Sequence, residues 1–496
     1  MRKAILVKQA GKLAIGTLCM LSSTFIFNDI PAMAIAPQTN YPSAMSVSQM
    51  AGTHYLQSQN WESSVKTTIN EFLDLYGNRS ANYTANNRPY AVFDFDNTTS
   101  IMDMEEQLGI WQLEHLAFAI TPDQLGKILE TGIPADKLNL TYGANDGEGR
   151  AVRLSDAIYD STQAYASLYK KGLVSPNGRN LSVTTKNDPD YQEFTTKMRW
   201  LYDAIGETMD NAVSYPWITY WFTGMTPNQV YRLAYDCDSY YGNPAKGQTW
   251  TKEHFQSPAD RSGRAGNVNV SFNQGITVTP EIKELYGALD KNGIDIWIDS
   301  ASFIDVIRAA KDYFALPGVK GIVAMTNKLN KNGTYTNSYD YDFHAQTQGV
   351  GKAQTIDTVI RPKYQGQGPI FCAMDSQGDF NFCTEYKDTK AVLIMNRKRK
   401  DDAALCAAIA VWQKSQAITL QQANNAGDTK FLLQRRNENT GTLWADNTTL
   451  LLGKKENSYL SDKATNAIKQ LDQGLSIKDV LQKDTKLKDY QGYKTR

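Results

Sequence analysis

The sequence has few cysteines and histidines, from which zinc and thiol sites are built, and no excess of basic over acidic residues. Its 496 residues include five cysteines and four histidines, and these form no Cys-x-x-Cys pair and no histidine cluster. The usual zinc-binding motifs are therefore excluded. Basic and acidic residues balance at 52 each, so the chain has no excess positive charge to attract a nucleic acid.

Long hydrophobic runs are also lacking, apart from one near the beginning. Residues 1–34 combine basic residues, an apolar segment and the small residues Ala32 and Ala34, which is typical of an export signal cleaved after Ala34. The apolar segment is shorter than the ~20 residues of a membrane-spanning helix, which favours a cleaved signal over an anchor. The basic residues of this segment are Arg2, Lys3, Lys8 and Lys12. We expect an exported protein, periplasmic or extracellular, without a transmembrane segment after cleavage.

Removal of this signal changes the charge and the cysteine content. Four of the 52 basic residues and Asp29 of the 52 acidic residues are lost, which leaves a net charge of about −3. The remaining cysteines are Cys237, Cys372, Cys383 and Cys406. An oxidising compartment permits one or two disulfides among them, but their connectivity and the oligomeric state are left open by the sequence.

Paired acidic residues follow a buried strand in the stretch YAVFDFDNTTS. Residues 91–93 are apolar, and a polar turn cluster bounds them, as expected for a strand. Residues two apart in a strand point to the same face, so Asp94 and Asp96 project together. Two carboxylates that close are costly unless a proton or a cation lies between them. A solvated turn is the ordinary alternative.

Three further polar signals lie at the ends of predicted elements. Ser300 follows a predicted strand at 294–298, Lys352 opens a helix after two glycines, and Asp375 and Asp379 follow a strand at 369–374. Each has an ordinary explanation on its own: a helix cap, a surface lysine and a solvated acidic loop. Their order and spacing make them informative together.

These residues resemble the motifs of the haloacid dehalogenase (HAD) superfamily of phosphatases, in the phosphoserine phosphatase-like branch. The first motif, Asp-x-Asp-x-Thr, matches Asp94, Asp96 and Thr98, and the later motifs match in order. The residues of the later motifs are Ser300, Lys352, Asp375 and Asp379. Two positions depart from the pattern: Met374 stands where glycine is frequent, and Gly378 stands where related phosphatases often have asparagine.

The resemblance implies a reaction and a set of roles. Asp94 would be the nucleophile that forms an aspartyl-phosphate, and Asp96 would act as general acid and base. Ser300 and Lys352 would hold phosphoryl oxygens. Mg²⁺ is the expected cofactor, with Asp94, Asp96, Asp375 and Asp379 as its expected ligands. The residues expected to contact the substrate are Thr98, Asp103, Glu106 and Ala301.

The same resemblance implies an α/β fold with a Rossmann-like parallel sheet and a large, mainly helical cap. The catalytic core is expected at 35–103 and 290–455, the cap at 104–289 and a helical extension at 456–496. Most of the many cap aromatics are expected to be core residues. The stretch NRKRKDD at 396–402 is interpreted as a solvated surface run.

Phosphorylcholine is the leading expected substrate. Asp103, Glu105 and Glu106 could hold an amine, cap aromatics could cage a quaternary ammonium group, and the export signal and the cap resemble bacterial phosphorylcholine phosphatases. The acidic residues have an ordinary alternative as the first turn of a helix. Three other functions remain open: a broad-specificity acid phosphatase or phosphoserine-type phosphatase, a choline- or phosphate-binding protein without activity, and a surface-interaction protein.

Overall fold

The core of the protein is a seven-stranded, mostly parallel sheet. The computed structural model describes residues 55–242, 250–260 and 263–496, so the predicted signal at 1–34 lies outside the described residues. The strand order is β13-β12-β11-β10-β1-β6-β7, and every neighbouring pair is parallel except β12 and β13. In sequence order the strands are β1 (Tyr90–Phe93), β6 (Asp295–Phe303), β7 (Val319–Met325), β10 (Phe371–Met374), β11 (Ala391–Met395), β12 (Lys430–Asn437) and β13 (Thr442–Trp444).

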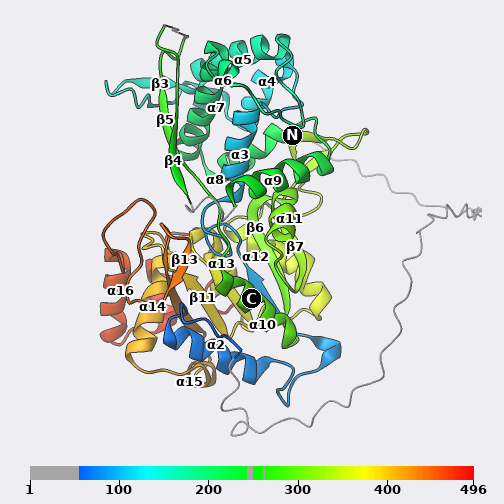
Figure 1. The fold of residues 1–496 in the computed structure, drawn as a ribbon. Helices are drawn as coiled ribbons and strands as arrows, with labels where there is room; N and C mark the ends of the chain where they lie inside the picture. Colours follow the sequence, from blue (N-terminus) through cyan, green and yellow to red (C-terminus); the bar gives the residue numbers. More distant parts are fainter. Residues whose placement is uncertain (1–54, 243–249, 261–262) are drawn as a thin grey trace, which may run out of the picture. The chain divides into compact units, whose positions relative to one another are not determined.

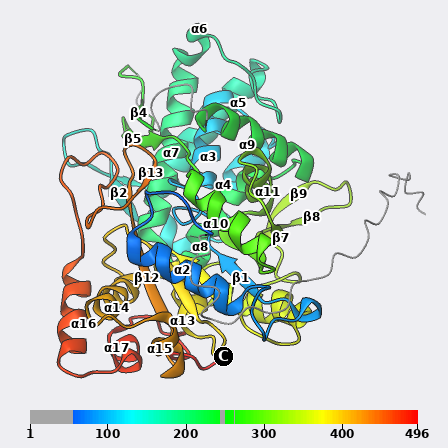
Figure 2. The ribbon, with the colours of Figure 1, turned by 60° about the horizontal axis from the view of Figure 1, so that its bottom comes forward.

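Helices cover both faces of this sheet. Successive side chains of a strand point to opposite faces, and in β1 Ala91 and Phe93 join one buried cluster whereas Tyr90 and Val92 join another. Side chains of α2 (Ser63–Tyr76), α10 (Pro280–Lys291), α11 (Ile304–Tyr313) and α15 (Leu420–Asn425) pack in the first cluster (Figure 1). Those of α12 (Val350–Thr355), α13 (Phe380–Thr384), α14 (Ala403–Ser415), α16 (Asp462–Asp472) and α17 (Ile477–Asp484) pack in the second (Figure 2). Because both faces of the sheet are buried, the strand sequences are continuous apolar runs.

The strands confirm the predicted α/β class, with one correction. β1 and β10 lie within two residues of their predicted bounds. β6, predicted to stop before Asp299, continues to Phe303, because Asp299 and Ser300 pair with Val323 and Ala324 of β7. Ser300 is therefore a strand residue, and the ordinary explanation of a helix cap does not hold.

A mainly helical region is inserted between β1 and β6, as the predicted fold class requires. Its helices are α3 (Met104–His115), α4 (Pro122–Leu129), α5 (Leu154–Lys170), α6 (Val183–Lys186), α7 (Pro189–Thr208), α8 (Asn211–Thr219) and α9 (Pro227–Tyr241). Two hairpins accompany them: β2 (Thr141–Gly143) with β3 (Ala151–Arg153), and β4 (Thr251–Gln256) with β5 (Asn269–Gln274). Trp200, Trp217 and Trp221 are buried in a hydrophobic cluster of this region, so most of its aromatic rings are core residues as expected.

The predicted domain boundaries stay predictions. α10, which the sequence assigns largely to the cap, packs against β6, and its Leu285 and Tyr286 share a cluster with Phe93 of β1. The remaining short elements are β8 (Asn327–Leu329), β9 (Tyr335–Tyr339), η1 (Ala85–Asn87), η2 (Ala135–Asn139), η3 (Tyr220–Phe222), η5 (Ile356–Ile360), η6 (Arg361–Tyr364) and η7 (Gln377–Asp379).

The C-terminal part and the cysteines complete the fold. β12 and β13 form an antiparallel hairpin, and α16 and α17 provide the predicted terminal helices. The four cysteines of the described chain are buried and free, so the disulfides that an oxidising compartment would permit are not formed among them. Within the described ranges, no helix is both long and apolar enough to cross a membrane.

Candidate active site

The predicted catalytic residues lie around one cavity at the carboxyl edge of the sheet. This edge is where ligands bind in open α/β sheets, and the cavity has a volume of about 690 Å³. Asp94 and Asp96 reach it from the end of β1, Lys352 from α12, and Asp375 and Asp379 from the loop after β10. β1 lies between β6 and β10 in the sheet, so segments far apart in sequence meet here.

The Asp94 carboxylate is held by two other motif residues. Lys352 Nζ lies 2.6 Å from Asp94 Oδ1, and the Thr98 hydroxyl donates to Asp94 Oδ2 at 2.7 Å. Lys352 also contacts Asp379 Oδ1 at 2.7 Å. Because Asp94 and Lys352 are only 5% and 2% exposed, these contacts fix the carboxylate in one orientation.

Asp96 is oriented by hydroxyl and backbone donors. Its Oδ1 accepts a hydrogen bond from the backbone N–H of Met104 at 2.7 Å, and its Oδ2 accepts from Ser302 at 2.7 Å and Ser300 at 3.1 Å. Ser300 and Ser302 are two residues apart on β6, so they lie on the same face of the strand. Ser302 was not predicted, and it was missed because the strand was expected to end before it.

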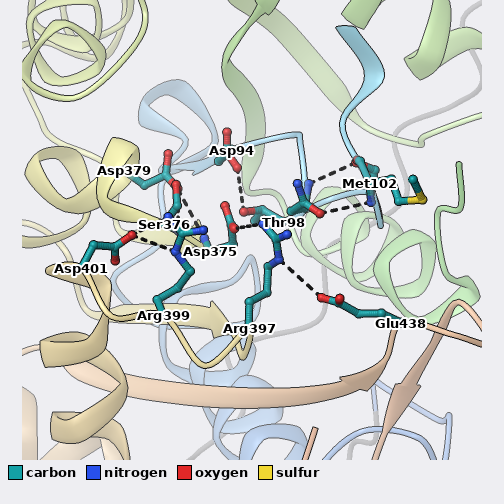
Figure 3. Close-up of polar contacts among 12 residues, drawn as sticks. Asp94, Thr98, Met102, Asp375, Ser376, Asp379, Arg397, Arg399, Asp401 and Glu438 are labelled. Carbon is teal, nitrogen blue, oxygen red and sulfur yellow. Dashed lines mark hydrogen bonds and ion pairs between the residues drawn. The ribbon is translucent and has the colours of Figure 1, made fainter. Parts of the chain in front are cut away.

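Three acidic residues form a group that fits a divalent cation. Asp94, Asp375 and Asp379 are buried, and each offers a carboxylate oxygen within 4.8 Å of the others (Figure 3). Asp379 is the least free of them, because its Oδ1 contacts Lys352 and its Oδ2 accepts from the backbone N–H groups of Asp375 and Ser376 at 3.3 Å. An all-oxygen group of this kind suits Mg²⁺.

Burial shifts the ionisation of these acids. It raises the pKa of Asp94 to about 6, with Lys352 opposing the shift. It raises the pKa of Asp96 to about 7, with a further contribution from the charge of Asp103, and the pKa of Asp379 to about 7, with a contribution from the charge of Asp94. Carboxyl groups that titrate near neutrality in one cavity are typical of acid–base catalysis, and a cation among them would relieve their repulsion.

The position of Lys352 depends on a close approach between the backbone at Gly351 and the backbone at Gln346. A Cβ atom added to Gly351 would lie 1.8 Å from the carbonyl oxygen of Gln346, so that only glycine fits. We expect Gly351→Ala to shift the start of α12, destabilise the protein by about 1–3 kcal/mol and lower its catalytic activity. Thermal unfolding and an activity assay check this expectation. Gly287→Ala is the matched control, because its added Cβ would make only an ordinary contact, 3.7 Å from Pro317. Equal unfolding midpoints for the two variants would contradict the argument.

The structure places some of the residues predicted to contact substrate in the cavity lining and others outside it. Asp103 and Ala301 line the cavity. Thr98 and Ser300 do not; their hydroxyls are donated to Asp94 and Asp96. Glu106 also lies outside the lining and pairs with Arg199 at 2.5 Å, and its contact with substrate stays a prediction.

Several lining residues were missed by the sequence. Glu105, named from the sequence as a possible amine ligand but not among the expected substrate contacts, is buried and lines the cavity. From the inserted region come Tyr142, Tyr202, Asp203, Glu207 and Tyr215, for which no motif gives a signal. Arg397 contradicts the interpretation of NRKRKDD as a solvated run, because it lines the cavity and pairs with Asp375 at 2.8 Å. Gly378 lines the cavity without a side chain.

Comparison with known proteins relates the chain to solved structures. No protein-family model and no curated protein matches the sequence. A conserved protein of unknown function from Anaerococcus prevotii DSM 20548 is 26% identical, with a TM-score of 0.67 over 81% of this chain and 100% of its own.

Weaker similarity extends to two proteins with names that indicate a family or an activity. A HAD family hydrolase from Salmonella enterica serovar Typhi is 10% identical, with a TM-score of 0.28 over 62% of this chain and 63% of its own. A phosphoserine phosphohydrolase-like protein from Francisella tularensis is 14% identical, with a TM-score of 0.26 over 62% of this chain and 87% of its own. The fold is therefore shared across most of the chain with the Anaerococcus protein, whose function is unknown.

Proposed function

We propose that the protein is an exported, Mg²⁺-dependent phosphomonoesterase that acts through an aspartyl-phosphate. The observation that carries the proposal is the Asp94 carboxylate, held by Lys352 at 2.6 Å and set beside Asp96 in one cavity. Binding alone needs no nucleophile and proton donor side by side, so this pair favours catalysis over a non-catalytic binding protein.

The roles follow from the contacts. An oxygen of Asp94 attacks phosphorus, and the bond to the ester oxygen breaks while Asp96 gives that oxygen its proton. Asp96, now ionised, takes a proton from the water that cleaves the aspartyl-phosphate. Lys352 supplies positive charge beside the transferred group. Ser300 and Ser302 hold the Asp96 carboxyl in place through their hydroxyl groups.

The group that fits a cation would hold the proposed Mg²⁺. Asp94, Asp375 and Asp379 are the side chains that would hold it. The oxygens of Asp94 and Asp379 also accept hydrogen bonds, from Lys352, Thr98 and the loop, which orients both carboxylates. Bound there, Mg²⁺ supplies Lewis-acid neutralisation of the phosphoryl charge.

The charge of the cavity supports a cationic substrate. The eight lining carboxyl groups are those of Asp94, Asp96, Asp103, Glu105, Asp203, Glu207, Asp375 and Asp379, and the cationic groups are those of Lys352, Arg397 and Arg399. Tyr142, Tyr202 and Tyr215 add aromatic faces, which attract quaternary ammonium groups. Phosphorylcholine is our leading substrate, and a broad-specificity or phosphoserine-type phosphatase is the second candidate.

Phosphate release separates these candidates. The assay uses the purified protein with Mg²⁺ and compares phosphorylcholine, phosphoethanolamine, phosphoserine, sugar phosphates and an aryl phosphate. We expect the highest kcat/KM with phosphorylcholine. Comparable rates for all esters would keep the mechanism and reject the choline assignment. Binding of phosphorylcholine without release of phosphate would favour the binding-protein alternative.

A substitution of Glu207 tests independently whether the cavity binds a cationic group of the substrate. It lines the cavity from α7 and would face the ammonium group. We expect Glu207→Gln to raise the KM for phosphorylcholine about tenfold, equivalent to ~1.4 kcal/mol, while the KM for an aryl phosphate without a cationic group stays constant. Glu130→Gln on the exposed end of α4 is the control. An equal change in KM for both esters would argue against a cationic site at Glu207.

A further inference from the structure

Arg397 connects the proposed metal site to a buried ion-pair network that none of the four sequence motifs includes. Its Nη1 contacts Asp375 Oδ2 at 2.8 Å, and its Nε lies 3.4 Å from Glu438 Oε1. Figure 3 shows the Arg397 side chain between these two carboxylates. Arg397 follows β11 and Glu438 follows β12, so the network joins neighbouring strand ends at the carboxyl edge of the sheet.

Glu438 is itself fixed by a second arginine. Arg436, which is fully buried, donates to Glu438 Oε1 through Nη2 at 2.7 Å and Nε at 3.0 Å. The other carboxylate oxygen of Glu438 accepts from the backbone N–H of Leu452 at 2.8 Å. Although burial opposes ionisation of Glu438, Arg436 and Arg397 hold its pKa below the usual value. Glu438 is therefore an ionised, immobile partner for Arg397.

The network ends in the loop that follows Asp94. Arg436 Nη1 donates to the carbonyl oxygen of Asn97 at 2.6 Å. Asn97 has a left-handed backbone with φ of 63°, and its side chain accepts from the backbone N–H of Met102 at 3.2 Å. The chain of contacts from Asp375 through Arg397, Glu438 and Arg436 thus fixes the loop carrying the fourth motif relative to the loop carrying the first.

We propose that Arg397 is a positioning residue that orients Asp375 toward the divalent cation, with Glu438 and Arg436 as its support. The proposal rests on the proposed function, because it assumes the Mg²⁺ site. Arg397 occupies Asp375 Oδ2, and Oδ1 accepts no hydrogen bond from the described residues, so this oxygen is left for the cation. Groups that orient a metal ligand in this way typically contribute 10- to 100-fold to metal affinity.

Charge alone predicts the opposite effect, which makes the proposal testable. A guanidinium group beside a cation site repels the cation, so its removal would tighten binding if Arg397 acted only through its charge. If Arg397 orients Asp375, its removal weakens binding, because the freed carboxylate can adopt other rotamers. The sign of the change in affinity therefore distinguishes the two roles.

The experiment measures Mg²⁺ and Mn²⁺ binding to the purified protein by calorimetry. We expect the Kd to rise about 10- to 100-fold in Arg397→Met and by less in Arg397→Lys, which keeps the charge and one donor. Arg308→Met removes the same charge from the surface of α11, outside the cavity lining, where the arginine pairs with Asp305, and we expect no change in Kd. Thermal unfolding without metal checks that each variant is folded, and Arg397→Lys provides the test if Arg397→Met is not.

Activity gives a second measurement. We expect the Mg²⁺ concentration for half-maximal activity to rise in Arg397→Met, while the KM for substrate at saturating Mg²⁺ stays constant. An unchanged or lower Kd in a folded variant, with wild-type protein binding Mg²⁺, would overturn the role of Arg397 alone. Wild-type protein without affinity for either cation would contradict the proposed function as well, and the inference with it.

Discussion

Asp94→Asn is expected to abolish phosphate release, with a loss of about 10⁴-fold or more in kcat, because the amide cannot attack phosphorus. The fold should be unaffected. Asn retains the shape of the side chain: its carbonyl oxygen can accept from Lys352 and its amide can donate to the Thr98 hydroxyl, although the ion pair with Lys352 is lost. Steady-state assays at saturating Mg²⁺, together with thermal unfolding, measure both quantities.

The matched control for this substitution is Asp312→Asn. This substitution makes the same chemical change at a surface position. The side chain of Asp312 is 43% exposed and contacts Lys311 and Tyr231. We expect full activity from the control. A residual activity of Asp94→Asn above about one tenth of the wild-type value would rule out Asp94 as the nucleophile.

Asp96→Asn is expected to have a large effect that depends on the leaving group. An alkyl ester such as phosphorylcholine leaves as a poor alkoxide and needs a proton, whereas an activated aryl phosphate does not. We expect the rate of aspartyl-phosphate formation, measured as the first turnover of alcohol or phenol release, to fall about 10²- to 10⁴-fold for the alkyl ester, in the range of general acid catalysis, and much less for the aryl ester. Equal losses for both esters would contradict the role of Asp96 as a proton donor.

The same residue predicts a pH dependence. Burial, with the charge of Asp103, raises the pKa of Asp96 to about 7, so the protonated form that donates to the leaving group is present below this pH and is lost above it. We therefore expect the kcat for the alkyl ester to fall as the pH rises through about 7. This alkaline limb should be absent in Asp96→Asn. A limb that persists in the variant would assign the titration to another group.

Much of the core could be predicted from the sequence because buried strands leave a clear pattern. Both faces of the sheet are covered, so β1, β10 and β11 are continuous apolar runs, and their ends are marked by the polar residues of the site. Asp94, Asp375 and Asp379 follow two of these strands and Lys352 opens a helix; their order and spacing identified them, and the structure brings them together. The end of β6 was missed because Ser300 and Ser302 are also typical of helix caps.

The sequence did not predict which residues of the inserted region reach the cavity, nor the ion pairs that support the site. Asp203 and Glu207 reach the cavity because α7 packs where it does, and their spacing is equally typical of a solvated helix face. Arg397 lies in a charged stretch whose composition is typical of a solvated surface, and its partner Glu438 lies 41 positions further along the chain. The choice between Glu105 and Glu106 depended on the rotation of α3, which places Glu106 against Arg199.

The most direct test of Asp94 as the nucleophile is to trap the aspartyl-phosphate intermediate. The purified protein is mixed with Mg²⁺ and an activated aryl phosphate, quenched in acid within milliseconds, digested and mapped by mass spectrometry. We predict a phosphoryl group on the peptide containing Asp94, at Asp94 itself, and none in Asp94→Asn. Rapid release of phosphate by the wild-type protein with no acyl phosphate on this peptide, or with the label at another residue, would contradict this prediction.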